Sequence, residues 1–270
     1  MVLNDTFLII GGRNLAKELN FFNLNIKYVS AWDFCDIRAA SFHGYYGFIL
    51  AHSEVIQNIR DPNISNNVNQ ELLLEKFCNL PSKNKYFLSS AAVYGLRVSQ
   101  KPIKESDHLR GQTSYAKEKI SIEDKIKNNF PSIHGVNILR IPGLIYTSNE
   151  NISQNLFYKV KKIDSKNTGY LEIEHGGEQN RDFCTTEFLA DLFRCLPQQK
   201  SLQILNVADV EPINIKLFIT GILNNEKLKK IKFSTRERKA VHCSLDTQDL
   251  DNLIHFKKKS VFQVYGKLKI

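Results

Sequence analysis

The sequence predicts an α/β protein in which a doubly wound parallel sheet is accompanied by a smaller C-terminal lobe. Apolar runs of strand length alternate with segments of helical apolar spacing up to about residue 145, which is typical of a parallel sheet. A glycine turn joins the first strand to the first helix. After Tyr146 the chain becomes polar and then basic, which indicates the lobe. We expect residues 1–146 and about 182–210 to form the sheet domain, and 147–181 and 211–270 the lobe.

The first strand and its turn are candidates for binding a dinucleotide. Phe7–Ile10 is an apolar run that leads through Gly11 and Gly12 into a helical segment. Strand, glycine turn and helix together present backbone N–H groups and a helix N-terminus to a pyrophosphate. The motif is degraded, because Asn14 and Ala16 stand where further glycines are expected. The turn is compatible with a dinucleotide and does not by itself establish one.

The second strand bears on which dinucleotide would bind. It is expected at 26–30 and ends in Ser30, with no carboxylate until Asp33. An acidic residue at this point usually binds the ribose 2′-OH of NAD. Arg13 in the glycine turn and Arg38 further on could instead pair with a 2′-phosphate. This favours NADPH over NADH, with a solvated Arg13 as the alternative. The segment Ser30–Ile37 is so short that we expect no helix there.

The remaining elements follow from apolar periodicity and turn residues. In the first part of the chain we expect strands at 47–53, 85–95 and 136–141 and helices at 66–80 and 115–126. In the lobe and the segments around it we expect helices at 156–163, 186–196 and 213–223 and strands at 169–174 and 202–207.

Composition excludes several classes of protein. The 270 residues are 42% hydrophobic, which is enough to bury a core, and no run approaches the roughly 20 apolar residues of a membrane span. The start lacks the features of a signal peptide, so we expect a cytoplasmic protein. Five scattered cysteines without a C-x-x-C pair, and seven histidines without ligand spacing, indicate neither a disulfide framework nor a metal site.

The net charge of +9 raises the question of nucleic acid. Lysines cluster at 159–162, 227–232 and 257–259, and no aromatic residues interleave with them as a stacking platform requires. We therefore interpret the basic residues as a solvated surface, with attraction of a small anionic substrate as the other interpretation. Neither a nucleic acid nor a membrane is expected as a partner.

The candidate catalytic residues lie in two segments. The strand at 85–95 ends in the hydroxyls of Ser89 and Ser90, and Tyr115 and Lys119 are four residues apart in a helical segment. That spacing places the phenol and the ammonium on one helical face. A fixed positive charge is expected to lower the pKa of the phenol, and a nearby hydroxyl could hold a carbonyl oxygen against it. This arrangement suits the reduction of a ketone or the oxidation of an alcohol.

From Phe7 to about Phe256 the chain resembles the extended short-chain dehydrogenase/reductase family of nucleotide-sugar epimerases, dehydratases and ketoreductases. The resemblance implies a Rossmann sheet that binds NAD(P) and a lobe that binds a nucleotide sugar. It rests on short motifs shared in order: Gly11-Gly12, Ser89-Ser90-Ala91-Ala92-Val93-Tyr94-Gly95, Tyr115-x-x-x-Lys119, Leu139-Arg140-Ile141-Pro142-Gly143, Arg181-Asp182-Phe183 and Leu205-Asn206-Val207.

The resemblance implies a role for each matching residue. Ser90 would polarise the substrate oxygen, Tyr115 would be the acid/base, and Lys119 would tune it and bind the nicotinamide ribose. The residues expected to line the cofactor site are Gly11, Gly12, Arg13, Asn14, Leu15, Ser30, Asp36, Ile37, Arg38, Leu50, Ala51, His52, Asn66, Ser89, Tyr115, Lys119, Pro142 and Gly143. Those expected to contact substrate are Ser90, Ala91, Ala92, Arg181, Arg236 and Arg238.

Departures from the family pattern narrow the reaction. In the 4,6-dehydratases an aspartate and a glutamate follow the catalytic hydroxyl, whereas Ala91 and Ala92 stand here and cannot transfer a proton. Arg13 and the short segment after the second strand resemble 4-keto-sugar reductases. The leading hypothesis is therefore an NADPH-dependent reductase of a 4-keto, deoxy-type sugar nucleotide, serving bacterial-type surface polysaccharide precursors.

Two alternatives stay open. A nucleotide-sugar 4-epimerase would use the same residues with a retained NAD. A catalytically idle module that binds a dinucleotide or RNA is the alternative from another class, and the complete set of Ser90, Tyr115 and Lys119 argues against it. The resemblance also implies a homodimer, since family members often pair through the helix that carries the tyrosine.

Overall fold

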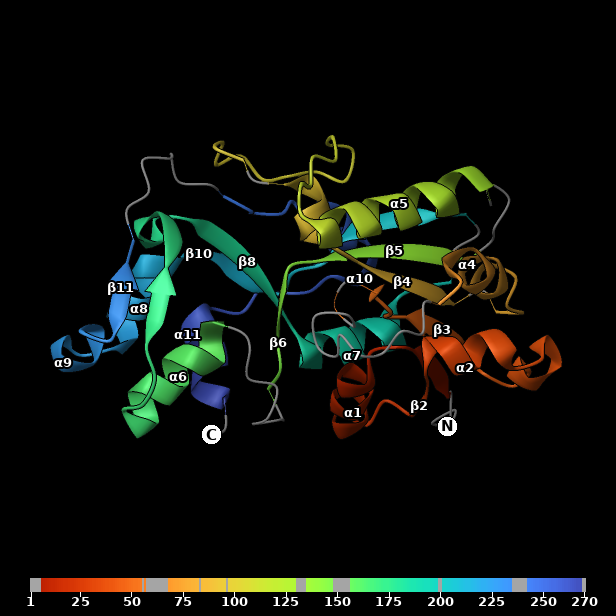
Figure 1. Cartoon of the computed structure of the whole chain (residues 1–270), viewed down its shortest axis with the longest axis horizontal. Helices are drawn as coiled ribbons and strands as arrows, with labels where there is room; N and C mark the ends of the chain where they lie inside the picture. Colours follow the sequence, from red (N-terminus) through yellow and green to blue (C-terminus); the bar gives the residue numbers. More distant parts are fainter. Residues whose placement is uncertain are drawn as a thin grey trace. The chain divides into compact units, whose positions relative to one another are not determined.

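A computed structural model describes residues 6–54, 56, 68–82, 84–95, 97–129, 135–147, 156–198, 201–234 and 242–268, without the side chains of 39 and 40 (Figure 1). Two compact units are present. The first contains residues 1–95, 108–140 and 190–205, and the second contains 96–107, 141–189 and 206–270. The second unit includes four ranges that the sequence assigns to the sheet domain: 96–107, 141–146, 182–189 and 206–210. The predicted domain boundaries stay a prediction.

The predicted α/β fold with a parallel sheet is confirmed. The sheet has six strands in the order β2-β1-β3-β4-β5-β9, and β1 pairs in parallel with both β2 and β3. Helices cover both faces of such a sheet, so its strands read as continuous apolar runs. The strands are β1 (Phe7–Ile10), β2 (Ile26–Val29), β3 (Gly47–Leu50), β4 (Lys85–Ser90), β5 (Val136–Ile141) and β9 (Gln203–Asn206).

Alternate residues of each strand supply the two faces of the sheet. On one face Leu8 and Ile10 join a core with Phe34, Phe77 and Ile126 of three helices. On the other face the Phe7 and Tyr86 rings lie 6.1 and 5.0 Å from the Phe193 ring. The helices of this part are α1 (Arg13–Phe21), α2 (Ala31–Asp36), α4 (Gln70–Cys78), α5 (Ser114–Asn129) and α7 (Thr186–Cys195), with short helical turns η1 (Ala39–Phe42) and η2 (Ala91–Tyr94).

The expectation that no helix fits after the second strand is wrong. Helix α2 begins directly after Ser30, whose hydroxyl accepts a hydrogen bond from the backbone N–H of Asp33 at 3.0 Å. At the other end, Lys76 of α4 donates to the carbonyls of Cys35, at 2.8 Å, and Ile37. A helix cap and a neighbouring cation thus hold a helix that is too short to show apolar periodicity.

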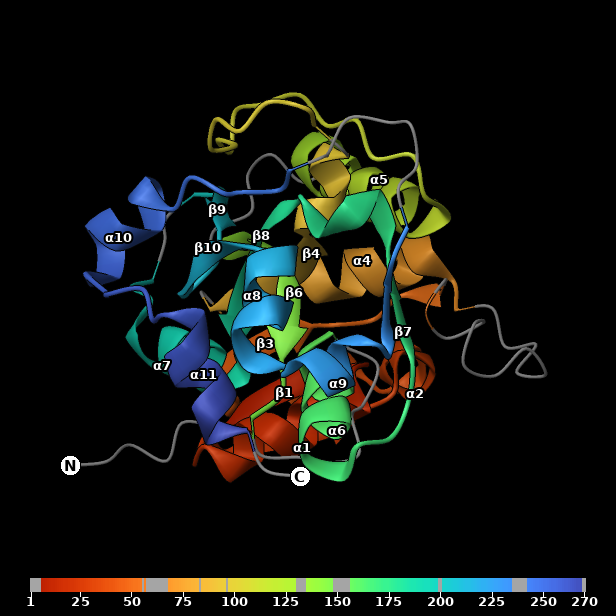
Figure 2. The ribbon, with the colours of Figure 1, turned by 90° about the vertical axis from the view of Figure 1, so that its left-hand side faces the viewer.

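The second unit holds two small sheets, of which Figure 2 labels the strands β6, β7, β8 and β10. It also has a hydrophobic core of its own. One sheet has the order β10-β8-β6, and the other pairs β11 with β7. The Phe157 ring lies 4.6 Å from that of Phe183 and 4.7 Å from that of Phe218 at the centre of this core. The elements are β6 (Gly143–Ile145), α6 (Leu156–Lys166), β7 (Leu171–Ile173), η3 (Glu174–Gly177), β8 (Asn180–Thr185), β10 (Val210–Asn214), α8 (Ile215–Ile222), α9 (Asn225–Leu228), β11 (Ile231–Phe233), α10 (Gln248–Ile254) and α11 (Val261–Lys267).

None of the helices within the described ranges combines the length and the hydropathy that a membrane span requires.

The second unit also buries a carboxylate. Asp182 of β8 is 2% exposed and accepts a hydrogen bond from the backbone N–H of Leu245. Burial raises the pKa of Asp182 to about 6, against the opposing effects of the Leu245 N–H, the Lys258 charge and a hydrogen bond with Ser244.

This burial predicts an unusual pH dependence of stability. Since the folded-state pKa of Asp182, about 6, lies above that of an unfolded chain, about 3.9, the folded state binds the proton more tightly. The contribution of Asp182 to the free energy of unfolding is then complete below about pH 4 and lost as the pH rises through 6, by at most about 3 kcal/mol. Urea titrations between pH 4 and 7.5 should show that Asp182→Asn removes this component. The exposed Glu211→Gln on β10 is the control, and an unchanged pH dependence in Asp182→Asn would contradict the assignment.

Candidate functional site

Helix α5 brings the predicted tyrosine and lysine together. Thr113 caps the helix, its hydroxyl accepting from the backbone N–H of Ala116 at 3.1 Å. Lys119 is 2% exposed, and its ammonium donates to the carbonyl of His52 at 3.1 Å. The same nitrogen lies 5.8 Å from the centre of the Tyr115 ring. The two side chains therefore share one face of α5, as the spacing predicts.

Ser90 completes the set from the end of β4. Its side chain accepts a hydrogen bond from the backbone N–H of Ala92 at 3.2 Å and so caps η2. It also hydrogen-bonds Tyr115. The predicted trio of Ser90, Tyr115 and Lys119 is thus assembled in the first unit.

A glycine allows the two segments to approach this closely. A Cβ on Gly111 would lie 2.5 Å from the Cβ of Ala116 and 2.7 Å from the carbonyl oxygen of Ala92. The backbone N–H groups of Arg110 and Gly111 both donate to the carbonyl of Val93 at 2.9 Å. The chain entering α5 is therefore fixed against the turn that carries Ser90.

Burial decides the protonation of the two α5 side chains. It lowers the pKa of Lys119 to about 8, and the charges of Glu118 and Glu123 oppose that fall. It raises the pKa of Tyr115, while the hydrogen bond with Ser90 lowers it and the charge of Glu118 raises it. The expectation that the ammonium lowers the phenol pKa is therefore wrong here, since desolvation dominates. Tyr115 stays protonated at neutral pH and is suited to donating a proton.

A buried ion pair underlies these residues, and the sequence reasoning missed it. Glu123 and Arg140 are 0% and 1% exposed, and the guanidinium donates to both carboxylate oxygens, at 3.1 and 2.6 Å. Arg140 also donates to the Tyr94 hydroxyl at 2.8 Å, and Ser89 donates to Glu123 at 2.6 Å. The carboxylate lies eight residues after Tyr115 and four after Lys119, a helical spacing that was the available signal.

The glycine turn fits the pyrophosphate of a dinucleotide. Gly11 and Gly12 have φ of 72° and 64°, and a Cβ on Gly11 would lie 2.8 Å from the Cα of His52. The first turn of α1 carries no acidic residue, and Gly12 provides no side-chain cap for its N–H groups. The turn lies where β1 separates β2 from β3, the point at which the strand order reverses. Backbone donors and a close approach are what a bound pyrophosphate requires.

The arginine of this turn is held by an aromatic ring. Arg13 is exposed, and its guanidinium carbon lies 5.2 Å from the centre of the Tyr28 ring on β2. Ser30 donates to the Asp33 carboxylate at 2.6 Å, so the carboxylate lies at the end of β2 after all. Of the other residues predicted at this end, Asn14, Asp36 and Arg38 are exposed, Ile37 is half-buried, and the Leu15 side chain is buried in the core.

The other predicted cofactor residues have varied surroundings. Leu50 is buried in the sheet, and Ala51 and His52 follow it at the end of β3. Burial lowers the pKa of His52 to about 4, with Glu118 raising it and Lys119 lowering it, so the imidazole is neutral. The Ser89 hydroxyl donates a hydrogen bond to the Glu123 carboxylate. Pro142 and Gly143 lie in the second unit, where a Cβ on Gly143 would lie 3.0 Å from the Phe183 ring.

The predicted substrate residues likewise belong to both units. Ala91 is buried and Ala92 half-buried, both in η2 of the first unit. Arg181 is exposed on β8 of the second unit and donates to the Gln179 side chain at 2.9 Å. The predicted residues Asn66, Arg236 and Arg238 lie outside the described residues.

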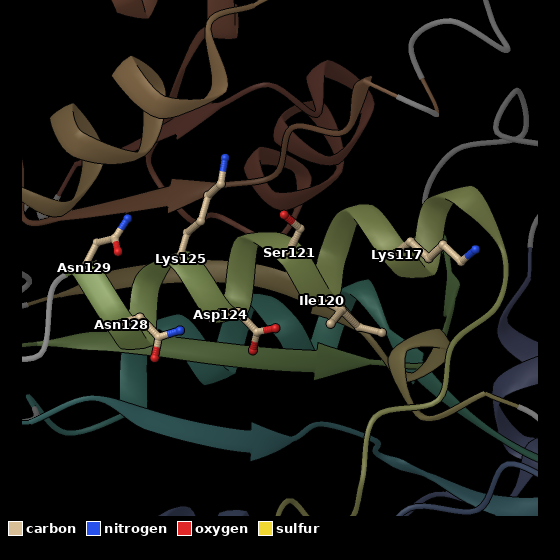
Figure 3. Close-up of a pocket in the computed structure, with 7 residues that line it drawn as sticks. All are labelled: Lys117, Ile120, Ser121, Asp124, Lys125, Asn128 and Asn129. Carbon is tan, nitrogen blue, oxygen red and sulfur yellow. The ribbon is translucent and has the colours of Figure 1, made fainter.

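A pocket on the first unit lies apart from the trio. Figure 3 shows that one side of α5 provides its lining, formed by Lys117, Ile120, Ser121, Asp124, Lys125, Asn128 and Asn129. Ser90, Tyr115 and Lys119 do not line it. Across the described ranges, no three His, Cys, Asp or Glu side chains come together as a metal site.

The chain matches one protein-family model and several solved structures. The sequence model of the NAD dependent epimerase/dehydratase family matches residues 37–208, more than half of the chain. No curated protein matches the chain by sequence. Among solved structures, UDP-glucose 4-epimerase of Thermotoga maritima with UDP-glucose is similar, with a TM-score of 0.74, 15% identity and coverage of 97% of this chain and 96% of that one.

Two further solved structures share the fold. MoeE5 in complex with UDP-glucuronic acid and NAD has a TM-score of 0.73 at 13% identity, covering 98% of this chain and 97% of that one. The dTDP-glucose 4,6-dehydratase of Bacillus anthracis in complex with NAD has a TM-score of 0.72 at 14% identity, covering 97% of each chain. At these identities the likeness establishes the fold.

The buried ion pair predicts a large loss of stability on removing one partner. Glu123→Gln leaves the Arg140 guanidinium buried without its counter-charge, so we expect the free energy of unfolding in urea to fall by about 3–5 kcal/mol. Asp124→Asn is the matched control, since the neighbouring carboxylate is 55% exposed and should contribute within about 0.5 kcal/mol. A loss for Glu123→Gln as small as that of Asp124→Asn would contradict the structural role of the pair.

Proposed function

The chain belongs to the NAD dependent epimerase/dehydratase family, a family of nucleotide-sugar enzymes, and we propose that it is an NADPH-dependent reductase of a 4-keto, deoxy-type sugar nucleotide. The observation that carries the proposal is the Tyr115 phenol, which stays protonated at neutral pH and is hydrogen-bonded to Ser90. Burial raises the pKa of this phenol. A reductase needs a protonated group beside the ketone oxygen, and the half-buried Tyr115 phenol with its raised pKa is one.

The residues divide the work of reduction. The bound dinucleotide supplies the hydride. Ser90 holds the ketone oxygen, and Tyr115 donates the proton to it as the alcohol forms. Lys119 orients the nicotinamide ribose, and its ammonium lies 5.8 Å from the centre of the Tyr115 ring. The backbone of Gly11 and Gly12 holds the pyrophosphate. Ala91 and Ala92 provide no group for elimination, which supports reduction over dehydration.

The basic side chain in the glycine turn supports NADPH. The Tyr28 ring holds the Arg13 guanidinium beside the end of β2, where the adenosine ribose is expected to lie. An arginine there pairs with a 2′-phosphate. Arg181, with Arg236 or Arg238, is proposed to bind the nucleotide and diphosphate of the substrate.

A 4-epimerase that retains NAD is the second candidate. The Asp33 carboxylate, hydrogen-bonded by Ser30 at the end of β2, is of the kind that binds a ribose 2′-OH. The similar structures of MoeE5 and of the B. anthracis dehydratase contain NAD. NAD that stays bound through purification, together with interconversion of UDP-glucose and UDP-galactose, would favour the epimerase.

Three further properties are proposed with the reductase. They are a homodimer formed through α5, a cytoplasmic location, and a place in the synthesis of precursors of bacterial-type surface polysaccharide.

Tyr115→Phe tests the mechanism. We expect kcat for NADPH-dependent reduction of a dTDP-, UDP- or GDP-linked 4-keto-6-deoxysugar to fall by about 10²–10⁴-fold, because the proton donor is gone. Cofactor affinity, measured by NADPH fluorescence, should be largely unchanged. The control is Tyr170→Phe at an exposed tyrosine. Full turnover in Tyr115→Phe would rule out the mechanism.

Arg13→Gln tests the cofactor. Loss of a charge-assisted contact to the 2′-phosphate should weaken NADPH binding by roughly tenfold in a titration and leave NADH binding unchanged. Lys17→Gln, at an exposed lysine of the same helix, should change neither. If Arg13→Gln weakens both cofactors equally, Arg13 does not select between them.

A further inference from the structure

The proposed mechanism gives no role to Glu118, the carboxylate that precedes Lys119 in the sequence. Glu118 of α5 is half-buried and binds the segment that follows β3. One of its oxygens accepts from the Ser53 hydroxyl at 2.5 Å, and the other accepts from the backbone N–H of Glu54 at 2.7 Å. Ser53 in turn accepts from the backbone N–H of Ile56 at 3.2 Å. Both oxygens of Glu118 are thus used to fix a neighbouring segment of chain.

The next residue of the helix binds the same segment. Lys119 donates to the carbonyl of His52, so consecutive residues of α5 hold three consecutive residues, His52 to Glu54. The contact with His52 also adjoins the glycine turn, since a Cβ on Gly11 would collide with the His52 backbone. Glu118 therefore helps to fix the distance between the catalytic helix and the turn proposed to bind the pyrophosphate.

The charge of Glu118 acts on the groups around it. It raises the pKa of Lys119, of His52 and of Tyr115. The other titratable groups facing Lys119 are Glu123 and Tyr115 on α5 and His52 at the end of β3, with Glu54 beyond it. Of the two carboxylates that raise the pKa of Lys119, Glu118 has the larger effect, and Glu123 is paired with Arg140. His52 is neutral.

We propose that Glu118 is a positioning residue of the site: it ties the segment His52–Glu54 to α5 and holds Lys119 in its protonated form. The proposal rests on the role of Lys119 in the reductase proposed above. A negative charge favours the ammonium and disfavours the phenolate. Removing it lowers the pKa of both groups, so the alkaline limb of the pH profile for reduction moves to lower pH.

The test follows Lys119 directly by ¹³C NMR of protein labelled at the lysine Cε carbons. Lys119→Met assigns the signal, which should titrate near pH 8, apart from the exposed lysines. Glu118→Gln keeps the shape of the side chain and removes its charge, so the midpoint should move to lower pH. Asp124→Asn makes the same change of charge at an exposed carboxylate of α5, drawn in Figure 3, and should leave the midpoint in place.

A second variant separates the effect of the Glu118 hydrogen bonds from the effect of its charge. Ser53→Ala removes one hydrogen bond to Glu118 and keeps the carboxylate. Hydrogen exchange of the peptide containing residues 52–54 should become faster in both Ser53→Ala and Glu118→Gln, while the Lys119 midpoint moves only in Glu118→Gln. Equal midpoints in Glu118→Gln and Asp124→Asn, or unchanged exchange, overturn the proposal. Absence of ketosugar reduction would instead overturn the proposed function, because these measurements need no turnover.

Discussion

The ion pair between Glu123 and Arg140 is the interaction on which the first unit's site depends. It joins α5 to β5, and through Ser89 and Tyr94 it also reaches β4 and η2. A fully buried pair is stable only when hydrogen bonds use the remaining donors and acceptors. Here the carboxylate receives bonds from the arginine, a serine and, at 3.4 Å, Lys127. Every element that carries a member of the trio is therefore tied to one buried charge.

The sheet was predictable because its inner strands, such as β1, β3 and β5, are buried on both faces. Val136–Ile141 is predicted and observed with the same bounds, because its mostly apolar residues end at Pro142 and Gly143. Helix α2 was not predictable from apolar spacing, since six residues held by the Ser30 cap make fewer than two turns. In the second unit the strand predicted at 169–174 is observed as β7, Leu171–Ile173, whereas β6, β8, β10 and β11 were not predicted. Strand β6, Gly143–Ile145, is too short by itself to show alternation.

The trio was predictable because helical spacing and a strand end suffice to place it. Its electrostatics were not, because the pKa of Tyr115 depends on burial more than on the neighbouring ammonium. The role of Glu118 was not predictable from the sequence either. Nothing in the sequence indicates that a residue at 118 binds Ser53 and Glu54, which lie more than sixty positions away along the chain. Long-range partners of this kind emerge only with the fold.

The two alanines of η2 differ in how readily each could be replaced by a residue that catalyses elimination. In the dehydratases that the sequence resembles, an acid and a base occupy the two positions after the catalytic hydroxyl. The second position, Ala92, is half-buried, whereas the first, Ala91, is 3% exposed. A carboxylate at 91 would be desolvated unless its surroundings changed as well. Since elimination in those enzymes uses both groups, the buried position 91 is the greater obstacle to acquiring it.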